Sequence, residues 1–393
     1  MKKILAMLLA LVMVMSLVAC GEKPVETTAP AETNAPAEST PETTAPVESD
    51  VEYKIAMITD YGDITDQSFN QTTYEAVKAF SEANGVDYNY YKPSGDSTAE
   101  RVAMVDAAIV DGYNVIVLPG YAFGETLVEV ADVYPEIKFI ALDVAEGEGG
   151  FAATENVFSA VYQEELSGYM AGVAAVKLGY KHLGYLGGMA VPAVQRFGYG
   201  FLQGVDAAAK ELGIVGDIKV EYVYGNQFYG DADITAVMDT WYGEKGVECV
   251  FACGGGIWSS AAEAAAKVGG KVIGVDVDQA AIIDGAYGEG MTVTSAMKGL
   301  APTVNDVLTA IVLEDNWAAY AGKIETLGLV SADPEANYVQ IPMASTQFAE
   351  GFTAEDYSAL VAAMFEGTVT VSGDIAEFPV TEVAVEQHAN IKG

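Results

Sequence analysis

Histidine, cysteine and basic residues are scarce in this chain. Of its 393 residues, two are histidines, three are cysteines and 19 are lysines or arginines, against 56 aspartates and glutamates. So large an excess of negative charge leaves no basic patch to attract a nucleic acid or an anionic substrate. We therefore expect neither as a partner, and we interpret the charge as a solubility feature.

The motifs of several common enzyme classes are also missing. The sequence contains no GxxxxGK[ST], GxSxG or HExxH pattern, and the glycine run at 254–256 lacks the third glycine of GxGxxG. Neither His182 nor His388 lies within a motif. Cys249 and Cys253 lie in an apolar stretch, which favours buried thiols over a disulfide or a metal site. We expect no catalytic residue, no metal and no cofactor, although a hydrolase that uses two carboxylates stays open.

The first 20 residues have the pattern of a secretory signal. Lys2 and Lys3 precede an apolar run at 4–15 that is short for a membrane span, and Leu-Val-Ala stands directly before Cys20. This ending resembles the bacterial lipobox, in which the cysteine becomes the lipidated first residue of the mature chain. An ordinary secretory signal with an unrelated cysteine is the alternative.

Residues 21–50 consist mostly of threonine, alanine, proline, glutamate and serine, which predicts a disordered linker. A lipid on Cys20 and this linker would hold a folded part outside the membrane without spanning it. Without Lys2 and Lys3, 17 basic residues remain against 56 acidic ones, a formal charge of about −39. The remaining stretch of about 340 residues is long enough for two domains.

From residue 53 onward, short β-rich runs alternate with helical patterns. This alternation predicts an α/β fold with two doubly wound parallel-sheet lobes, each covered by helices on both faces. Strands are expected at 53–60, 86–91, 113–118, 137–143, 182–187, 217–224, 247–253, 271–277, 291–298, 324–330 and 337–341. Helices are expected at 68–83, 97–111, 124–133, 163–178, 192–212, 231–242, 257–268 and 302–314.

The region after residue 291 does not form a third domain in this interpretation. We expect the chain to cross back between the lobes, which creates a multi-crossover hinge and a ligand cleft between the sheet edges. The expected N-lobe comprises 51–160 and 292–328, and the expected C-lobe comprises 161–291 and 329–393.

Polar and aromatic residues gather in the loops that follow the expected strands. Because parallel strands present their carboxyl ends at one edge, these side chains should lie close together. Carboxylates accept paired hydrogen bonds from vicinal diols and aromatic faces stack on planar rings, so the set suits a neutral ligand with a flat ring and several hydroxyls. The candidate ligand-binding residues are Asp66, Phe69, Asn70, Tyr121, Asp143, Phe228, Gly254, Gly255, Trp258, Asp276 and Lys298.

Each candidate also has a structural explanation, which the sequence leaves open. Asp66, Asp143 and Asp276 could cap the helices that follow them. The glycine run could be only a tight turn, the aromatic residues could belong to a core, and Lys298 could be a solvated side chain.

Six segments carry a family resemblance: DQSFN (66–70), KFIALD (138–143), EELSGYMAGVAA (164–175), RFGYGFLQGV (196–205), VIGVDVDQ (272–279) and TSAMKG (294–299). Through them the chain resembles the basic membrane protein (BMP) or PnrA-like family, the nucleoside-binding lipoproteins of ABC transporters, over about 340 residues. The resemblance implies an architecture like that of type I periplasmic binding proteins. It also implies a nucleoside ligand and, as partners, a permease and ATPase subunits.

The resemblance assigns roles to several candidates. In that family the Phe of SFN and a later aromatic residue stack on the base, which implies Phe69 and Phe228. The Asn of SFN and the Asp that ends KFxxxD contact the ligand, which implies Asn70 and Asp143.

The remaining assignments concern the second half of the chain. The first Asp of GVDxDQ and the Lys of TSxxK hold the ribose hydroxyls in the family, which implies Asp276 and Lys298. A glycine of the glycine-rich loop lies against the ligand, here Gly254 or Gly255. Trp258 departs from the pattern, because a small residue is expected there.

Together these observations predict a monomeric, lipid-anchored, extracytoplasmic substrate-binding protein that is not an enzyme and that binds a nucleoside, most simply a purine nucleoside. A sugar receptor of the same architecture, an extracellular nucleoside-hydrolysing enzyme and a sensory or adhesion lipoprotein remain as alternatives.

Overall fold

The computed structural model describes residues 51–393, which belong to one compact unit. The signal sequence, Cys20 and the linker predicted for residues 1–50 lie outside the described residues. Two sheets organise the described part of the chain, and each forms the centre of a lobe.

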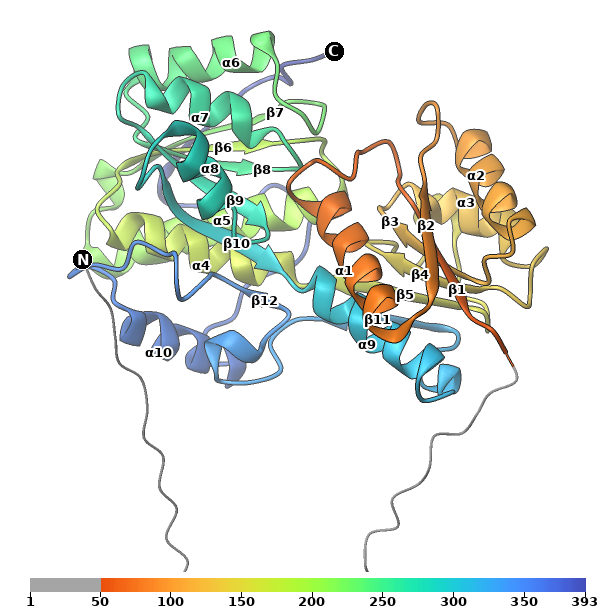
Figure 1. Ribbon diagram of the computed structural model, residues 1–393. Coiled ribbons are helices and arrows are strands. Elements are labelled where there is room, and N and C mark those ends of the chain that lie inside the picture. Colours follow the sequence, from red (N-terminus) through yellow and green to blue (C-terminus); the bar gives the residue numbers. More distant parts are fainter. Residues whose placement is uncertain (1–50) are drawn as a thin grey trace, which may run out of the picture. The chain divides into compact units, whose positions relative to one another are not determined.

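The first lobe contains a six-stranded parallel sheet in the order β11-β5-β4-β3-β1-β2. Helices α1 (Phe69–Asn84) and α9 (Leu300–Val312) cover one face, and α2 (Thr98–Val110) and α3 (Phe123–Val130) cover the other (Figure 1). Apolar residues are buried on both faces of the central strands, as continuous apolar runs predict. The strands are β1 (Lys54–Ile58), β2 (Asp87–Tyr91), β3 (Val115–Pro119), β4 (Lys138–Leu142), β5 (Val157–Tyr162) and β11 (Lys323–Leu327).

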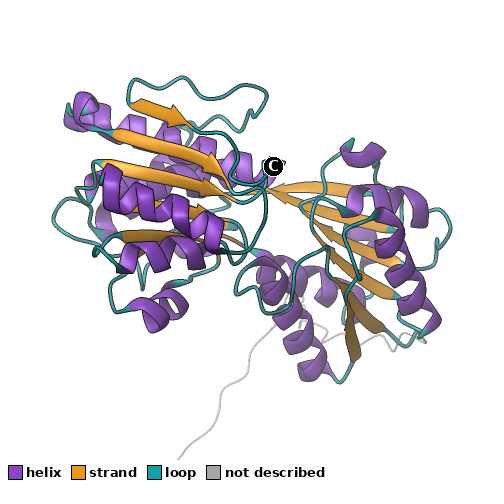
Figure 2. Ribbon diagram, turned by 90° about the horizontal axis from the view of Figure 1, so that it is seen from above, coloured by secondary structure: helices purple, strands orange, loops and turns teal. Residues whose placement is uncertain are grey.

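The second lobe contains a seven-stranded sheet in the order β12-β10-β9-β8-β6-β7-β13. Its strands are β6 (His182–Gly187), β7 (Lys219–Tyr224), β8 (Cys249–Cys253), β9 (Lys271–Asp276), β10 (Thr292–Lys298), β12 (Val339–Gln340) and β13 (Ala384–Gln387). Its helices are α4 (Glu164–Lys177), α5 (Pro192–Leu212) and α10 (Ala354–Phe365) on one face, and α6 (Ala232–Asp239), α7 (Trp258–Ala266) and α8 (Ala280–Tyr287) on the other. Each sheet thus lies between helices (Figure 2), which is the predicted fold class.

Short helical turns complete the elements. They are η1 (Glu148–Gly150), η2 (Val215–Asp217), η4 (Trp317–Ala319) and η5 (Pro334–Ala336), together with a π-helical turn, η3 (Thr240–Lys245).

Helices α4 and α5 approach each other so closely that glycines are required at their contact. A Cβ at Gly168 or Gly172 would lie 2.2 or 2.3 Å from a carbonyl oxygen of α5. A Cβ at Gly200 or Gly204 would lie 2.1 Å from a carbonyl oxygen of α4. The glycines of the segments EELSGYMAGVAA and RFGYGFLQGV therefore serve to pack these two helices.

Three segments connect the lobes, and hydrogen bonds join them to one another. The chain crosses at Gln163, at Gly299 and through 328–338. The amide of Gln163 donates to the carbonyl of Leu327 at 2.9 Å, and the amide of Gly299 donates to the carbonyl of Tyr338 at 2.6 Å. The three crossings therefore form one hinge.

One lobe assignment made from the sequence is wrong. Strand 291–298 was expected in the N-lobe, but β10 pairs with β9 in the second sheet, with Ser295 opposite Gly274. The chain returns to the first lobe only after Lys298, and it contributes α9 and β11 there. An apolar run such as MTVTSAMK fits either sheet, and only its pairing partner decides between them.

Several elements were not predicted. β5 follows a polar loop and directly precedes α4, so its apolar run was not separated from its surroundings. α8 has eight residues, of which one is buried, and β13 is an edge strand with no fully buried residue. Short or exposed elements of this kind have weak periodicity. The strands expected at 324–330 and 337–341 exist as β11 and β12, but they belong to different sheets.

A buried glutamate fixes the C-terminal strand. Glu221 on β7 is fully buried, and both histidines of the chain contact it, His182 at 3.1 Å and His388 at 2.5 Å. Lys219 and Lys245 lie 2.6 and 2.7 Å from its carboxylate. Burial by itself would raise the pKa of Glu221, but hydrogen bonds from these four partners lower it to about 2.

We expect Glu221→Gln to destabilise the protein at pH 7 by about 1–3 kcal/mol, because the substitution removes a buried, charged acceptor of hydrogen bonds from four partly exposed partners. Since the pKa of Glu221 is lower in the folded than in the unfolded state, its contribution is present above about pH 4.5 and is lost as the pH falls toward 2. Urea denaturation at pH 7, 4.5 and 3 measures both effects.

The matched control is Glu386→Gln, which removes an exposed carboxylate that pairs with the same two lysines. Its effect should stay below about 1 kcal/mol. Equal effects of the two substitutions would contradict the role given to Glu221.

Candidate functional site

A cavity of about 830 Å³ lies between the lobes, at the loops that follow the strands of both sheets. It falls within the range typical of small-molecule sites. All eleven residues proposed from the sequence line it: Asp66, Phe69, Asn70, Tyr121, Asp143, Phe228, Gly254, Gly255, Trp258, Asp276 and Lys298. The strand-end pattern therefore predicted that the fold brings these eleven residues together, but it missed others in the cavity wall, such as Tyr61, Val194 and Phe197.

Lys298 is buried in this cavity and contacts carboxylates from both lobes. Its ammonium lies 2.5 Å from Asp143 Oδ2 of the first lobe. In the second lobe it lies 3.8 Å from Asp276 Oδ1 and 3.5 Å from Glu164 Oε1. The side chain is 3% exposed, so the alternative of a solvated lysine is wrong.

Burial and charge oppose each other in this cluster. Burial raises the pKa of Asp143 to about 6, although the Lys298 ammonium pulls it down. Burial also raises the pKa of Asp276, against the pull of Lys298 and a hydrogen bond from Ser68. For Lys298, burial acts to lower the pKa, but Asp143, Asp276 and Glu164 together raise it above its usual value. The lysine therefore stays charged at neutral pH.

Glu164 is held by a second cation. Its Oε2 accepts a hydrogen bond from Arg196 Nε at 2.6 Å, and the glutamate side chain is fully buried. Glu164 stands in the first turn of α4 and Arg196 in the first turns of α5, the two helices joined by glycine contacts. Arg196 thus holds Glu164, and Glu164 lies beside the Lys298 ammonium. The strand-end pattern missed this pair because both residues lie within helices.

The backbone is unusual at the same place. Asp143 and Asp276 have φ angles of 63° and 65°, in the left-handed region that most side chains avoid. Gln67 and Asn226, with φ angles of 57° and 63°, also line the cavity. Such strained residues concentrate at functional sites.

Asp66 has a structural role within the cavity wall. Its carboxylate accepts hydrogen bonds from the amides of Ser68, Asn70 and Gln71 at 2.9–3.0 Å, and one from Asn70 Nδ2 at 3.1 Å. These bonds cap α1, as the helix-cap alternative proposed. Ser68 has a different function, since its hydroxyl donates to Asp276 Oδ2 across the cleft at 2.6 Å.

Asp60 was missed by the sequence analysis. It lines the cavity directly after β1, just as Asp143 follows β4, but the expected strand 53–60 included it. Burial raises the pKa of Asp60 to about 6, although its Oδ1 accepts the Gly62 amide at 2.7 Å. The same strand-end pattern would have selected it with a strand boundary two residues earlier.

The aromatic residues lie in two places. The Phe69 ring lies 4.6 Å from the Lys298 ammonium, which is a cation–π contact. Phe228 reaches the cavity from the loop after β7 and packs on glycines: a Cβ at Gly254 would lie 2.9 Å from its ring, and a Cβ at Gly255 would lie 2.7 Å from its carbonyl oxygen. With φ angles of 145° and 50°, these two glycines also form the tight turn that was the alternative to a ligand contact.

Three buried polar atoms of cavity residues have no hydrogen-bond partner within residues 51–393. They are Asn70 Oδ1, Asp143 Oδ1 and Trp258 Nε1. An unsatisfied buried group of this kind costs about 1–3 kcal/mol, so these three atoms are candidates for hydrogen bonds to a ligand. Trp258 also packs in the core between β8 and α8, with Tyr287 at 6.4 Å, so it has both a core role and a place in the cavity wall.

The charges of the cavity are mostly negative. Its six carboxylates face two lysines, of which Lys92 pairs with Asp63 at 2.5 Å and Lys298 pairs with Asp143. A phosphate group would find no unpaired cation among these residues. The site therefore suits a neutral or cationic ligand.

Within residues 51–393, one group has the spacing of metal ligands, namely Glu221, Glu386 and His388. The Lys245 ammonium lies 2.7, 3.3 and 3.5 Å from these three side chains, so a protein cation already neutralises them. Across the same residues, no helix has the length and the apolar character needed to cross a membrane.

Comparison with known proteins agrees with this geometry. Residues 53–332 match the family described as ABC transporter substrate-binding protein PnrA-like. The ABC transporter nucleoside-binding protein BmpA of Lactococcus lactis subsp. cremoris is 28% identical over 250 residues, which cover 60% of this chain and 67% of the relative. An uncharacterized lipoprotein of Pyrococcus abyssi is 29% identical over 185 residues, 46% of this chain and 44% of that protein.

A solved structure supports the fold. The solute-binding protein of an ABC transporter system from Aeropyrum pernix K1 superposes with a TM-score of 0.63 at 24% identity, and it covers 81% of this chain and 87% of its own. This likeness confirms the predicted two-lobe α/β architecture of periplasmic binding proteins. The family consists of extracytoplasmic proteins that bind a substrate for a permease and its ATPase subunits, and these are not enzymes. The family match extends over most of the described residues, so this chain belongs to the PnrA-like family of ABC transporter substrate-binding proteins.

Proposed function

We propose that this protein binds a nucleoside, most simply a purine nucleoside, between its lobes and delivers it to an ABC permease. The observation that carries this proposal is the buried cluster of Lys298, Asp143 and Asp276 beside aromatic rings in one cavity. Carboxylates and an ammonium suit the two hydroxyls of a ribose, and ring faces suit a base. The name of the Lactococcus relative, a nucleoside-binding protein, supports the same ligand class.

Different residues contact the ribose and the base of the nucleoside. Asp143 and Asp276 accept hydrogen bonds from the ribose hydroxyls, and Lys298 donates to their oxygens. Asn70 offers the edge of the base an amide that can donate and accept, with Asp60 close by on the same loop. Phe228 and Phe69 provide apolar ring faces, while Asp66 shapes the loop and does not contact the ligand.

We expect the lobes to close on the ligand, because the ligand-binding residues come from both lobes. Asn70 and Asp143 belong to the first lobe, whereas Phe228, Asp276 and Lys298 belong to the second. A ligand that contacts both sets stabilises the closed arrangement relative to the open one. Contacts without ligand support closure too, since Gln279 Nε2 donates to the carbonyl of Gln67 across the cleft at 3.0 Å.

The location of the protein is part of the proposal. Cys20 follows a lipobox-like sequence, and the Pyrococcus relative is named a lipoprotein. We infer a lipid anchor at Cys20 and a linker at 21–50 that hold the two lobes, as a monomer, outside the membrane. A sugar receptor is the second candidate, because the carboxylates and Lys298 would also bind a pyranose.

The first prediction concerns ligand class. Purine nucleosides at millimolar concentration should raise the melting temperature of the mature protein more than ribose does, since a ligand at 1,000 times its Kd adds about 4 kcal/mol of stability. Adenosine 5′-monophosphate should raise it little, because the cationic groups of the cavity are already paired. A shift with hexoses or pentoses alone would favour a sugar receptor.

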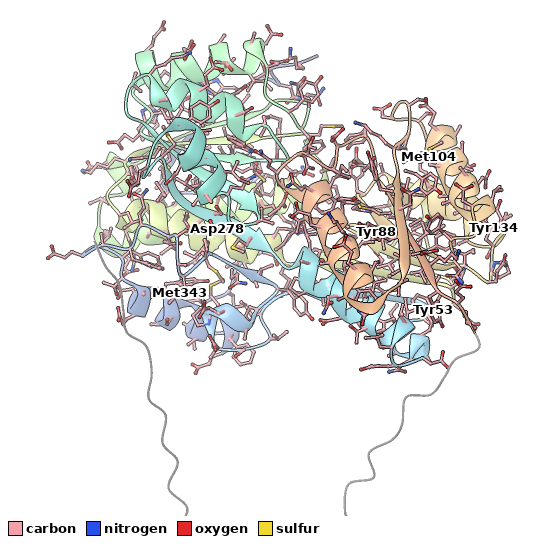
Figure 3. The ribbon with its side chains drawn as sticks, in the orientation of Figure 1. Tyr53, Tyr88, Met104, Tyr134, Asp278 and Met343 are labelled. Carbon is pink, nitrogen blue, oxygen red and sulfur yellow. The ribbon has the colours of Figure 1, made fainter. Side chains whose placement is uncertain are left out.

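A second prediction isolates the ribose contact. Asp276→Asn should weaken nucleoside binding by about 10- to 150-fold, which corresponds to the loss of hydrogen bonds to a charged group. Asp278→Asn is the matched control: Asp278 (Figure 3) is two residues away, is absent from the cavity wall and only accepts the amide of Ala280. Isothermal titration calorimetry compares the two variants, and similar affinities would sink the assignment of Asp276.

A third prediction concerns pH. With a pKa of about 6, Asp143 is ionised at pH 7.5 and becomes protonated below pH 6, where a ligand hydroxyl loses its acceptor. We expect Kd to stay constant above pH 7 and to rise by about tenfold per pH unit below 6. Asp143→Asn should bind weakly at pH 7.5 with a flatter pH profile. An affinity that is equal at pH 5 and 7.5 in the unmodified protein would refute this role.

A further inference from the structure

Two aromatic rings meet across the cleft at the wall of the cavity. Tyr61, in the loop after β1 of the first lobe, lies parallel to Phe228 of the second lobe, with ring centroids 5.9 Å apart and an interplanar angle of 14°. Both residues line the cavity, and the sequence analysis proposed only Phe228.

Contacts with neighbouring residues fix the position of each ring. The hydroxyl of Tyr61 donates to the hydroxyl of Tyr121 at 3.2 Å, and burial raises the pKa of Tyr61, which keeps this proton in place. The next residue is Gly62, where a Cβ would lie 2.1 Å from Asn70 Nδ2, so the loop rests directly on Asn70. On the other side, a Cβ at Gly188 would lie 2.5 Å from the Phe228 ring, so this ring lies on backbone.

The two rings are stacked on each other in this arrangement of the lobes. A planar base in contact with a ring on each side needs about 7 Å between the ring centres, since contacting carbons lie ~3.5 Å apart. The observed centroid distance of 5.9 Å lies in the range of two aromatic rings in direct contact, so a base enters between them only after a rotation of the hinged lobes separates the rings.

Phe69 is in a different position. The Lys298 ammonium lies 4.6 Å from its ring centre, and the same ammonium lies 5.5 Å from the Tyr162 ring and 5.8 Å from the Phe197 ring. One face of Phe69 is therefore occupied by a cation at the ribose-binding end of the cavity. The parallel pair of Tyr61 and Phe228 has no such cation at its faces among the described residues.

We propose that Tyr61 is a base-stacking residue: the base inserts between Tyr61 of the first lobe and Phe228 of the second, and Tyr121 holds the Tyr61 ring parallel. This inference rests on the proposed function, because it requires a ligand with a planar ring. It adds a stacking wall from the first lobe, and it makes the base itself a contact that joins the lobes.

The test uses three variants of the mature protein with the purine nucleoside that wild type binds best. Tyr61→Leu keeps apolar bulk but removes the ring face, and it should weaken binding by about 5- to 100-fold, the range measured for loss of one base–aromatic stack. Most of this loss should appear as faster dissociation. Tyr61→Phe should keep affinity within about threefold of wild type, because the ring face remains.

Tyr61→Trp provides a readout that a merely structural role would not produce. If a base stacks on residue 61, adding nucleoside should quench tryptophan emission in this variant beyond the change seen in wild type, which has Trp241, Trp258 and Trp317. Tyr90→Leu is the control: Tyr90 is an exposed aromatic residue on β2, packs on Tyr74 and is absent from the cavity wall. It should change neither affinity nor dissociation rate.

The outcomes separate the two proposals. If wild type binds nucleosides while Tyr61→Leu keeps its affinity and dissociation rate, Tyr61 is not a stacking residue and the proposed function stands. Absence of extra quenching in a Tyr61→Trp protein that still binds would also overturn the stacking role. If wild type binds only sugars, the proposed function fails and this inference fails with it.

Discussion

The ion pair between Lys298 and Asp143 is the interaction on which the site and the hinge both depend. It is buried, it joins the two lobes, and Lys298 is the last residue of β10 before the chain crosses at Gly299. Removing an ammonium from water costs several kcal/mol unless carboxylates replace the lost hydration. The contact of Asp143 with the ammonium and the relative position of the two lobes therefore depend on each other.

Two carboxylates of the second lobe, Glu164 and Asp276, lie beside the Lys298 ammonium. Close glycine contacts between α4 and α5 hold Glu164 and Arg196 at a fixed spacing, and Glu164 in turn lies beside the Lys298 ammonium. Asp276 belongs to the same lobe. The ammonium thus has two carboxylate neighbours in its own lobe, and Asp143 is the carboxylate that the first lobe contributes. A charged group that is already oriented in this way loses little freedom when a ligand binds.

The sequence predicted the fold class and eleven residues of the cavity wall, because both depend on local order. Each parallel strand places its following loop at one edge, so listing loops was enough to find residues as distant as Phe69 and Lys298. The lobe assignment of β10 failed, because pairing with β9 is a long-range contact that the run MTVTSAMK does not encode. Asp60 was missed through a strand boundary misplaced by two residues. The capping role of Asp66 was foreseen only as an alternative, since a carboxylate before a helix serves either purpose.

The contact between Tyr61 and Phe228 shows the limit of such prediction most clearly. It depends on the relative position of two lobes, and no spacing in the chain relates residue 61 to residue 228. The same holds for the hydrogen bonds of Ser68 with Asp276, of Gln279 with Gln67 and of Lys298 with Asp143, which also cross the cleft. The loop that caps α1 with Asp66 thus also contacts the second lobe through Ser68 and places the Tyr61 ring beside Phe228.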